Sequence, residues 1–291
     1  MGWLISVAGA ILVLLSLRDM FHRIWHPSGQ GTISRLVLQA VWRGTRLLKS
    51  RSEQTSVIGP AALLAVILTW ALLILFGWTL IYWPHMAEGF SFGSSLNPAQ
   101  RGDFADSLYV SLVTLATLGY GDIVPIYGWL RMLAPVEAFI GFALLTAAVS
   151  WVLQVYPALA RRRVLAIRLS LLEKAGTAGA LSTLDSSAAS TLLHSLAEQL
   201  AQVRVDLTQY SETYYFREAD VVSSLPAKLP YVLDLTRAAS RSARADVRLA
   251  AAVLDGALHD YVTVLTQQLV EAGEDLEESL GRYAADHGYA T

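Results

Sequence analysis

The chain contains no cysteine, which excludes disulfide bonds and metal sites with thiolate ligands. It is also short of charge, because Asp, Glu, Lys and Arg make up 16% of its 291 residues while hydrophobic residues make up 54%. Soluble domains have about 25% charged residues, so this composition does not fit an ordinary soluble protein. The net charge of −2 gives no sign of a nucleic-acid partner. The composition indicates a membrane protein.

Motifs of catalysis and nucleotide binding are missing as well. No G-x-G-x-x-G follows a strand pattern, and we find no catalytic triad or phosphate-binding loop. An acidic run, residues 271–278, lacks the alternating ligands and central glycine of a calcium-binding loop. We therefore expect that run to be a solvated helix face, and we expect neither an enzyme nor an organic cofactor.

The apolar residues are concentrated in three stretches, 3–17, 57–83 and 131–156. A membrane-spanning helix needs about 20 apolar residues, so the second and third stretches are predicted to span. The first stretch is short, and we weigh a short transmembrane helix over residues 1–20 against an interfacial or partly embedded one. A cleaved signal peptide fits less well, because no basic residue precedes the stretch and no A-x-A site follows it.

Basic residues predict the orientation. Residues 18–51 carry seven Lys or Arg and residues 161–174 carry five, whereas the connection 84–130 offers only Arg101. Because cytoplasmic loops are enriched in Lys and Arg, segment 21–56 and tail 161–291 are expected in the cytoplasm of a plasma-membrane protein. Residues 33–49 form a basic amphipathic pattern, with Arg35, Gln39, Arg43 and Arg46 opposite an apolar face. We expect this helix to bind anionic lipid at the interface, the alternative being a helix packed on the tail.

The most distinctive motif is Thr117-Leu118-Gly119-Tyr120-Gly121-Asp122. Such a segment can point successive backbone carbonyls, and the Thr117 hydroxyl, at one axis, where rings of oxygen replace the hydration shell of a potassium ion. Alternate residues then need conformations that are open mainly to glycine, which suits Gly119 and Gly121. Residues 104–116 before the motif are too short to span and suit a helix that dips into the membrane. Irregular backbone at that depth must line a water-filled path or be buried in protein.

Residues 108–125, LYVSLVTLATLGYGDIVP, resemble the pore loop and signature sequence of prokaryotic two-transmembrane potassium channels, over roughly residues 57–160. The resemblance implies an all-α membrane protein with an outer helix 57–83, a pore helix 104–116, a selectivity filter 117–122 and an inner helix 131–156. It also implies K+ bound at Thr117, Leu118, Gly119 and Tyr120, with Gly121 completing the filter. One pore loop per chain implies a homotetramer.

The resemblance further assigns supporting and gating positions. Thr114 falls at the first signature threonine, Asp122 just outside the filter, and Gly141 where a hinge glycine is common, although close helix packing would also explain a glycine there. By register with Gly141, we expect Phe142, Leu145, Thr146 and Val149 to line the inner cavity. Leu118 replaces the usual valine or isoleucine. Val113 stands where some bacterial channels have a glutamate that restrains the outer aspartate, so that restraint on Asp122 is expected to be absent.

Two further residues of the third stretch stand out. Glu137 is an acid within an apolar segment, and the alternatives are a network behind the filter or a snorkelling surface carboxylate. Pro157 lies near the cytoplasmic end and is predicted to terminate the inner helix at Tyr156, the alternative being a kink there.

The tail, residues 161–291, is predicted to be an all-α cytoplasmic bundle. One helix is predicted from apolar residues that recur three or four positions apart, namely Leu192, Leu196, Leu200, Val203, Leu207 and Tyr210. Residues 185–187 are expected to cap its amino-terminal end. Further helices are predicted over 231–268 and 269–283. No span has arginines at every third position, so no voltage sensor is expected. The sequence thus favours a potassium channel gated by its tail, by lipid or by the filter. A potassium-uptake transporter subunit and a non-conducting scaffold with a vestigial pore remain the alternatives.

Overall fold

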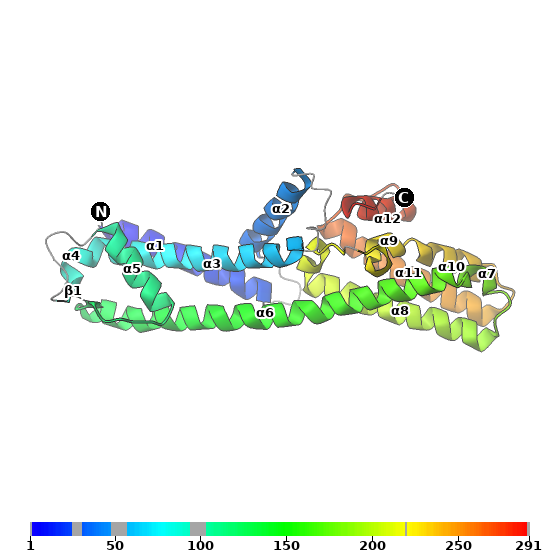
Figure 1. Ribbon diagram of the computed structural model, residues 1–291, viewed down its shortest axis with the longest axis horizontal. Coiled ribbons are helices and arrows are strands. Elements are labelled where there is room, and N and C mark those ends of the chain that lie inside the picture. The colour runs from blue at the N-terminus through cyan, green and yellow to red at the C-terminus, as the bar shows by residue number, and fades with distance from the viewer. Residues whose placement is uncertain (1, 25–30, 48–56, 94–102, 219, 290–291) are drawn as a thin grey trace. The chain divides into compact units, whose positions relative to one another are not determined.

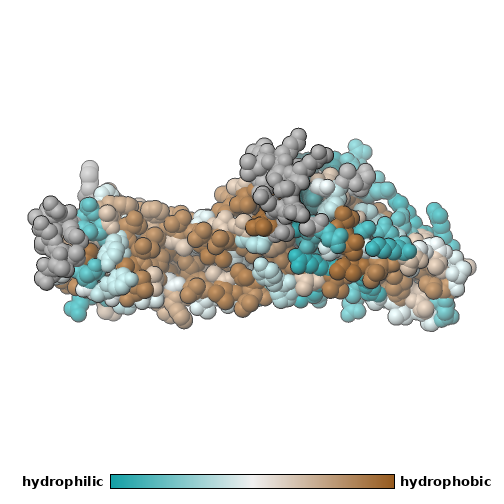
Figure 2. All heavy atoms as spheres, in the orientation of Figure 1, coloured by the Kyte–Doolittle hydropathy of each residue, from teal (hydrophilic) through white to brown (hydrophobic). Residues whose placement is uncertain are grey.

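The structure is a computed structural model, and it describes residues 2–24, 31–47, 57–93, 103–218 and 220–289 (Figure 1). The chain divides into two compact units. The first, here the membrane unit, comprises residues 1–43 and 62–153. The second, here the tail unit, comprises residues 44–61 and 154–291. Figure 2 shows apolar side chains gathered over the helices of the membrane unit.

The membrane unit is helical apart from one short strand pair. Its elements are α1 (Gly2–Ile24), α2 (Thr32–Leu47), α3 (Ile58–Tyr82), η2 (Trp83–His85), α4 (Met86–Gly89), β1 (Phe90–Phe92), α5 (Phe104–Leu115), β2 (Ile123–Pro125) and the long α6 (Gly128–Lys174), of which α2, α3 and α6 also contribute to the tail unit. The outer helix and the pore helix predicted at 57–83 and 104–116 correspond to α3 and α5. The protein is an all-α membrane protein.

The tail unit is a helical bundle. It contains α7 (Thr177–Ala180), α8 (Ser186–Gln209), η4 (Ser211–Tyr215), η5 (Val221–Ser223), α9 (Leu225–Lys228), α10 (Tyr231–Ser240), α11 (Ala245–Gln268) and α12 (Leu276–Asp286). Helix α11 packs against α8, α10 and α12. The predicted stripe on α8 is shifted at its start, because Leu193 rather than Leu192 is buried. The predicted 231–268 helix is interrupted between Ser240 and Ala245, and the last helix begins at Leu276 rather than at 269.

Four helical segments are long and apolar enough to cross a membrane among the described residues: α1, the stretch Ile58–Gly89, α6 and α11. Helix α11 has the lowest hydropathy of the four, and its apolar side is already packed inside the tail unit. Helix α1 has 23 residues and extends beyond the 3–17 stretch to include the charged residues Asp19 and Arg23, which are buried.

Helix α1 packs tightly on α3. A side-chain Cβ at Gly9 would lie 2.4 Å from the carbonyl oxygen of Gly77, and one at Gly77 would lie 2.6 Å from Cγ2 of Val13. Small residues allow such close approach of membrane helices. The close fit makes α1 an integral part of the membrane unit.

The predicted end of the inner helix at Tyr156 is wrong, because α6 continues through Pro157 to Lys174. A proline inside a helix costs about 3 kcal/mol, mainly through the lost N–H and a steric clash. Three neighbours on α6 are almost fully buried, namely Val155, Ala158 and Leu159. Their packing in the tail unit offsets the cost of the proline.

The basic helix packs on the chain through a face other than the predicted apolar face. Among the described side chains of α2, Ser34, Leu38 and Trp42 are buried, whereas Leu36, which belongs to the predicted apolar face, is 61% exposed. Binding of that apolar face to lipid stays a prediction. The start of α2 is fixed by Asp19 of α1, whose carboxylate accepts hydrogen bonds from the backbone N–H groups of Ile33 and Ser34. This contact turns Ser34 inward and selects the face that packs. Residues 48 and 49 of the predicted segment lie outside the described residues.

Candidate functional site

The motif at 117–122 follows directly on the pore helix α5. Asp103 caps the start of α5 by accepting a hydrogen bond from the Asp106 N–H at 3.0 Å. The helix is apolar and buries Val110 and Val113. It ends at Leu115, where the chain leaves helical geometry and enters the motif.

The first N–H groups of the motif bond back to the end of α5. The Thr117 N–H donates to the Thr114 carbonyl at 2.9 Å, and the Leu118 N–H donates to the Val113 carbonyl at 2.8 Å. The Gly119 N–H reaches the same Val113 oxygen at 3.2 Å. These three donors of the motif are therefore used on the side of the pore helix.

Backbone conformation alternates along the motif. Thr117, Gly119 and Gly121 have φ angles of +58°, +55° and +77°. A regular alternation of this kind turns successive carbonyls to one side, as the sequence predicts for the two glycines. The left-handed conformation of Thr117 was not predicted, because a β-branched residue rarely adopts it. Leu118 and Tyr120, at the intervening positions, are 58% and 68% exposed in the single chain.

Asp122, just beyond the alternating segment, is held by a residue that the sequence reading missed. The Tyr109 hydroxyl on α5 donates to the Asp122 carboxylate at 2.8 Å. Tyr109 thus restrains Asp122 in place of the glutamate that Val113 replaces, and the sequence analysis did not predict this second kind of restraint. Tyr109 lies four residues before Val113, on the same face of the pore helix, and it can reach the carboxylate because the tyrosine side chain is long.

A two-stranded antiparallel ribbon supports the outer end of the motif. Strand β2 begins directly after Asp122 and pairs with β1, with Phe92 opposite Ile123. The Gly93 N–H donates to the Asp122 carbonyl at 2.7 Å and extends the pairing. These strands were not predicted, because three-residue segments are too short for an alternating pattern to be recognised.

Glu137 lies in a buried network behind α5. Its carboxylate accepts hydrogen bonds from the Tyr82 hydroxyl of α3 at 2.7 Å and from the Ser111 hydroxyl of α5 at 2.5 Å. All three side chains are buried. This geometry corresponds to a network behind the filter rather than to a snorkelling carboxylate. The network joins α3, α5 and α6 through hydrogen bonds from neutral donors.

Gly141 packs against the last residue of the pore helix. A Cβ at this position would lie 1.9 Å from the carbonyl oxygen of Leu115. Any side chain would collide with backbone that leads into the motif, so close packing gives a physical reason for this glycine. The predicted cavity residues Phe142, Leu145, Thr146 and Val149 are all exposed in the single chain, on the side of α6 that does not pack on its own unit.

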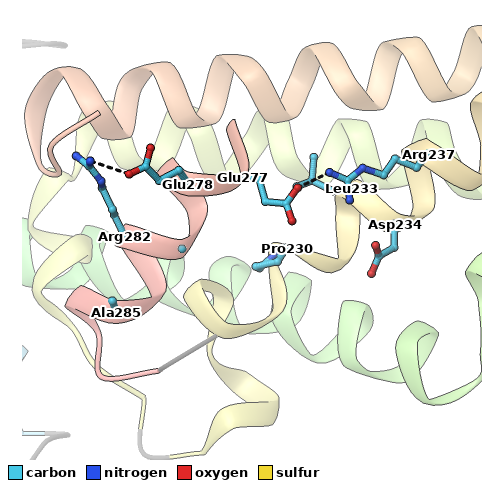
Figure 3. Close-up of a pocket in the computed structure, with 9 residues that line it drawn as sticks. Pro230, Leu233, Asp234, Arg237, Glu277, Glu278, Arg282 and Ala285 are labelled. Atoms are coloured by element: carbon cyan, nitrogen blue, oxygen red, sulfur yellow. Dashed lines mark hydrogen bonds and ion pairs between the residues drawn. The ribbon is translucent and has the colours of Figure 1, made fainter. Parts of the chain in front are cut away.

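A second candidate is a pocket of about 530 Å³ between α10 and α12 in the tail unit (Figure 3). Glu277 of the acidic run pairs with Arg237, and Glu278 pairs with Arg282 at 2.8 Å. The Glu274 N–H and Arg282 hold the pKa of Glu278 below its usual value. Among the described residues, no group of three or more His, Asp or Glu is placed to hold a metal ion.

Comparisons with known proteins bear on the membrane unit. Residues 68–156 match a family model described as "Ion channel". The chain is 29% identical over 175 residues to "Uncharacterized membrane protein YdjJ" of Bacillus subtilis (strain 168), a match that covers 59% of this chain and 50% of that protein. It is 38% identical over 81 residues to "Protein LctB" of Bacillus caldotenax, covering 26% of this chain and 60% of that protein.

A third relative is named "Putative potassium channel protein RPA4233", from Rhodopseudomonas palustris. It is 30% identical over 90 residues, which cover 31% of this chain and 21% of that protein. The chain thus spans between a fifth and three fifths of the length of these relatives. No solved structure matches significantly. The match to the family model includes α5, the motif, and the part of α6 up to Tyr156.

Proposed function

Because residues 68–156 match a family model described as "Ion channel", we propose that the protein conducts K+ passively through a potassium-selective filter at Thr117–Gly121, as a homotetramer. The observation that carries the proposal is the alternation of positive φ at Thr117, Gly119 and Gly121, combined with N–H groups bonded back to α5. This arrangement leaves the carbonyl oxygens of one side available to replace the hydration shell of a cation.

In this proposal four copies of the motif surround one axis. K+ binds to carbonyl oxygens of Thr117, Leu118, Gly119 and Tyr120 and to the Thr117 hydroxyl. The filter is held on its outer side by Tyr109 and Asp122. Glu137 and its partners support it from behind, and Gly141 allows the close packing at its base. Phe142, Leu145, Thr146 and Val149 line the cavity on the cytoplasmic side. The tail lies in the cytoplasm, and gating comes from the tail, from lipid at α2 or from the filter.

The test is flux from the purified full-length protein in liposomes. A potassium gradient should drive K+ flux that sodium does not support. Equal sodium permeability would contradict the selectivity claim. Slow, saturable uptake would favour a transporter subunit, and no flux under any lipid or pH condition would favour a non-conducting scaffold.

A matched glycine pair links the flux to the filter. Gly119→Ala forces an L-residue into a left-handed conformation, and this backbone strain should abolish selective flux. A Cβ at Gly119 meets nothing within 4 Å in the single chain, so a steric clash within the chain would not explain the loss. Gly179→Ala in α7 has equal space without a positive φ and should leave flux unchanged.

A further inference from the structure

A short buried segment of the tail unit, residues 210–218, contacts three other parts of the same unit. It follows α8 and contains η4. Every residue from Ser211 to Phe216 is at most 5% exposed. Irregular backbone is buried in this way only where other elements satisfy its polar groups. The partners of this segment, here the junction segment, are the first turn of α3, the part of α6 that follows Leu153, and α12.

The contact with α3 is made by Phe216. A side-chain Cβ at Gly59 would lie 2.4 Å from both Cγ and Cδ1 of Phe216, so the ring lies directly on the backbone of the first turn of α3. Gly59 and Phe216 belong to the tail unit, and α3 continues beyond Ala61 into the membrane unit. The absence of a side chain at Gly59 therefore makes this contact possible.

The contacts with α6 are polar and aromatic. The buried guanidinium of Arg162 donates to the Phe216 carbonyl at 2.7 Å. The Tyr210 hydroxyl donates to the side-chain oxygen of Gln154 at 2.8 Å. The Tyr156 ring meets the Phe216 ring edge-on, with 6.4 Å between centroids. Phe216 thus contacts both α3 and α6, the two helices that continue from the tail unit into the pore region.

The junction segment is also tied to α12 and to the residue that follows it. The Tyr214 hydroxyl donates to the Asp286 carboxylate, and Arg217 donates to the Asp286 carbonyl at 2.9 Å. A ring nitrogen of His287 lies 2.8 Å from the Tyr214 carbonyl oxygen, and the two rings meet edge-on at 4.8 Å. A displacement of α12 therefore acts on the backbone that carries Phe216.

We propose that the junction segment transmits displacements of α12 to the tail-unit ends of α3 and α6, and that Phe216 is the residue that couples the two helices. Closely packed interiors transmit strain and switch between discrete arrangements instead of deforming continuously. Further along, α3 carries Tyr82 of the Glu137 network, and α6 carries Gly141. The inference rests on the proposed channel function and adds the route by which the tail regulates the pore.

A double-mutant cycle tests this coupling through the open probability of the full-length protein in planar bilayers. Gly59→Ala places a methyl group against the Phe216 ring and should shift the ratio of open to closed time by about tenfold or more. Phe216→Ala removes the ring, so Gly59→Ala added to it should change the ratio by less than about twofold. Gly179→Ala, where a Cβ meets nothing within 4 Å, should leave the ratio unchanged.

The link to α12 is tested by a milder variant. Tyr214→Phe keeps the aromatic ring and removes only the hydroxyl that reaches Asp286. It should shift the ratio of open to closed time in the same direction as Phe216→Ala. An unchanged ratio would overturn the route from α12. In every variant the preference for K+ over Na+ should stay as in the unmodified protein, and a loss of selectivity would place the effect in the filter and overturn the coupling.

Hydrogen exchange in the purified full-length protein tests the coupling without any flux. Gly59→Ala should speed amide exchange about tenfold over residues 211–218 and over residues 283–287 at the end of α12. The amides of α11 should exchange as before, which separates a local effect from unfolding of the tail unit.

Three results would overturn the coupling. The first is additive effects of Gly59→Ala and Phe216→Ala on open probability. The second is unchanged exchange over residues 211–218 or 283–287, and the third is equally faster exchange in α11. If the unmodified protein shows no flux, the proposed channel function fails, and the exchange result by itself still supports or overturns the link from α3 to α12.

Discussion

Some carboxylates of the two units are held by different kinds of partner. In the membrane unit, Asp122 and Glu137 accept hydrogen bonds from neutral donors, namely Tyr109 for Asp122 and Tyr82 and Ser111 for Glu137. In the tail unit, Asp206 and Glu218 are paired with arginines that follow Pro157 on α6. Neutral donors satisfy an acid without placing a second charge in a membrane, whereas arginine pairs suit a surface that water reaches. Salt should therefore weaken the exposed contacts of the tail more than the buried contacts of the membrane unit.

The largest expected effect comes from two helix glycines, one in each unit. Gly141→Ala places a methyl group 1.9 Å from the Leu115 carbonyl oxygen and should abolish selective K+ flux by displacing the base of the filter. Gly256→Ala in α11 meets nothing within 4 Å and should raise tail stability by about 0.5–1 kcal/mol. Flux and thermal melting check the pair. Normal selectivity in Gly141→Ala would show that the close contact is not needed for the filter.

The next effect separates two arginines that share Glu218. Arg162 is buried and donates to the Phe216 carbonyl at 2.7 Å and to Glu218 at 3.1 Å, so Arg162→Ala should destabilise the tail by about 3–5 kcal/mol. The Arg163 side chain is 48% exposed, and Arg163→Ala should cost less than about 1 kcal/mol. Denaturant unfolding and hydrogen exchange over residues 211–218 measure the difference. Similar losses for both variants would contradict a buried role for Arg162.

Glu137 tests the neutral network of the membrane unit. Glu137→Ala leaves the buried Tyr82 hydroxyl without its acceptor, while Ser111 keeps a contact of 3.2 Å to the Leu75 carbonyl. We expect a loss of about 2–3 kcal/mol in thermal stability. Glu137→Gln retains an acceptor oxygen and should lose less than half as much. The loss should not depend on salt, and a strong salt dependence would argue for an unrecognised charged partner.

The smallest effect, taken per pH unit, is a pH dependence of the tail. His287 is buried among Tyr214, Tyr283, Asp286 and Arg162, and burial lowers its pKa to about 4. The unfolded chain therefore takes up the proton first, so stability is complete above about pH 6.5 and is lost as the pH falls toward 4. The slope is at most about 1.4 kcal/mol per pH unit.

Thermal melts between pH 7 and 5 measure this slope, and His287→Gln should flatten it. His259→Gln is the control, because the side chain of His259 is 58% exposed. An unchanged slope in His287→Gln would assign the pH dependence to another group.

The order of the pore elements could be read from the sequence because it rests on long apolar stretches and on glycines at alternate positions. The contacts that hold the filter could not. Tyr109 reaches Asp122 through three-dimensional proximity, and a tyrosine in an apolar helix gives no signal of its own. The effect of Pro157 was predicted wrongly because the low helix propensity of proline is outweighed by the burial of its neighbours on both sides. The face of α2 that packs is set by Asp19, which lies on α1. The periodicity of the α2 sequence therefore could not reveal it.

The carboxylate of Asp19 also bears on the order in which the protein is made. It joins the start of α2 to α1 and accepts a hydrogen bond from the indole N–H of Trp70 on α3 at 2.9 Å. During synthesis α1 emerges before α2 and α3. The donors of α2 follow Asp19 by 14 and 15 residues, whereas the Trp70 donor follows it by 51 residues. We therefore expect the contacts of Asp19 to be complete only when α3 has been made. The amino-terminal helix and the outer helix are expected to enter the bilayer as a pair.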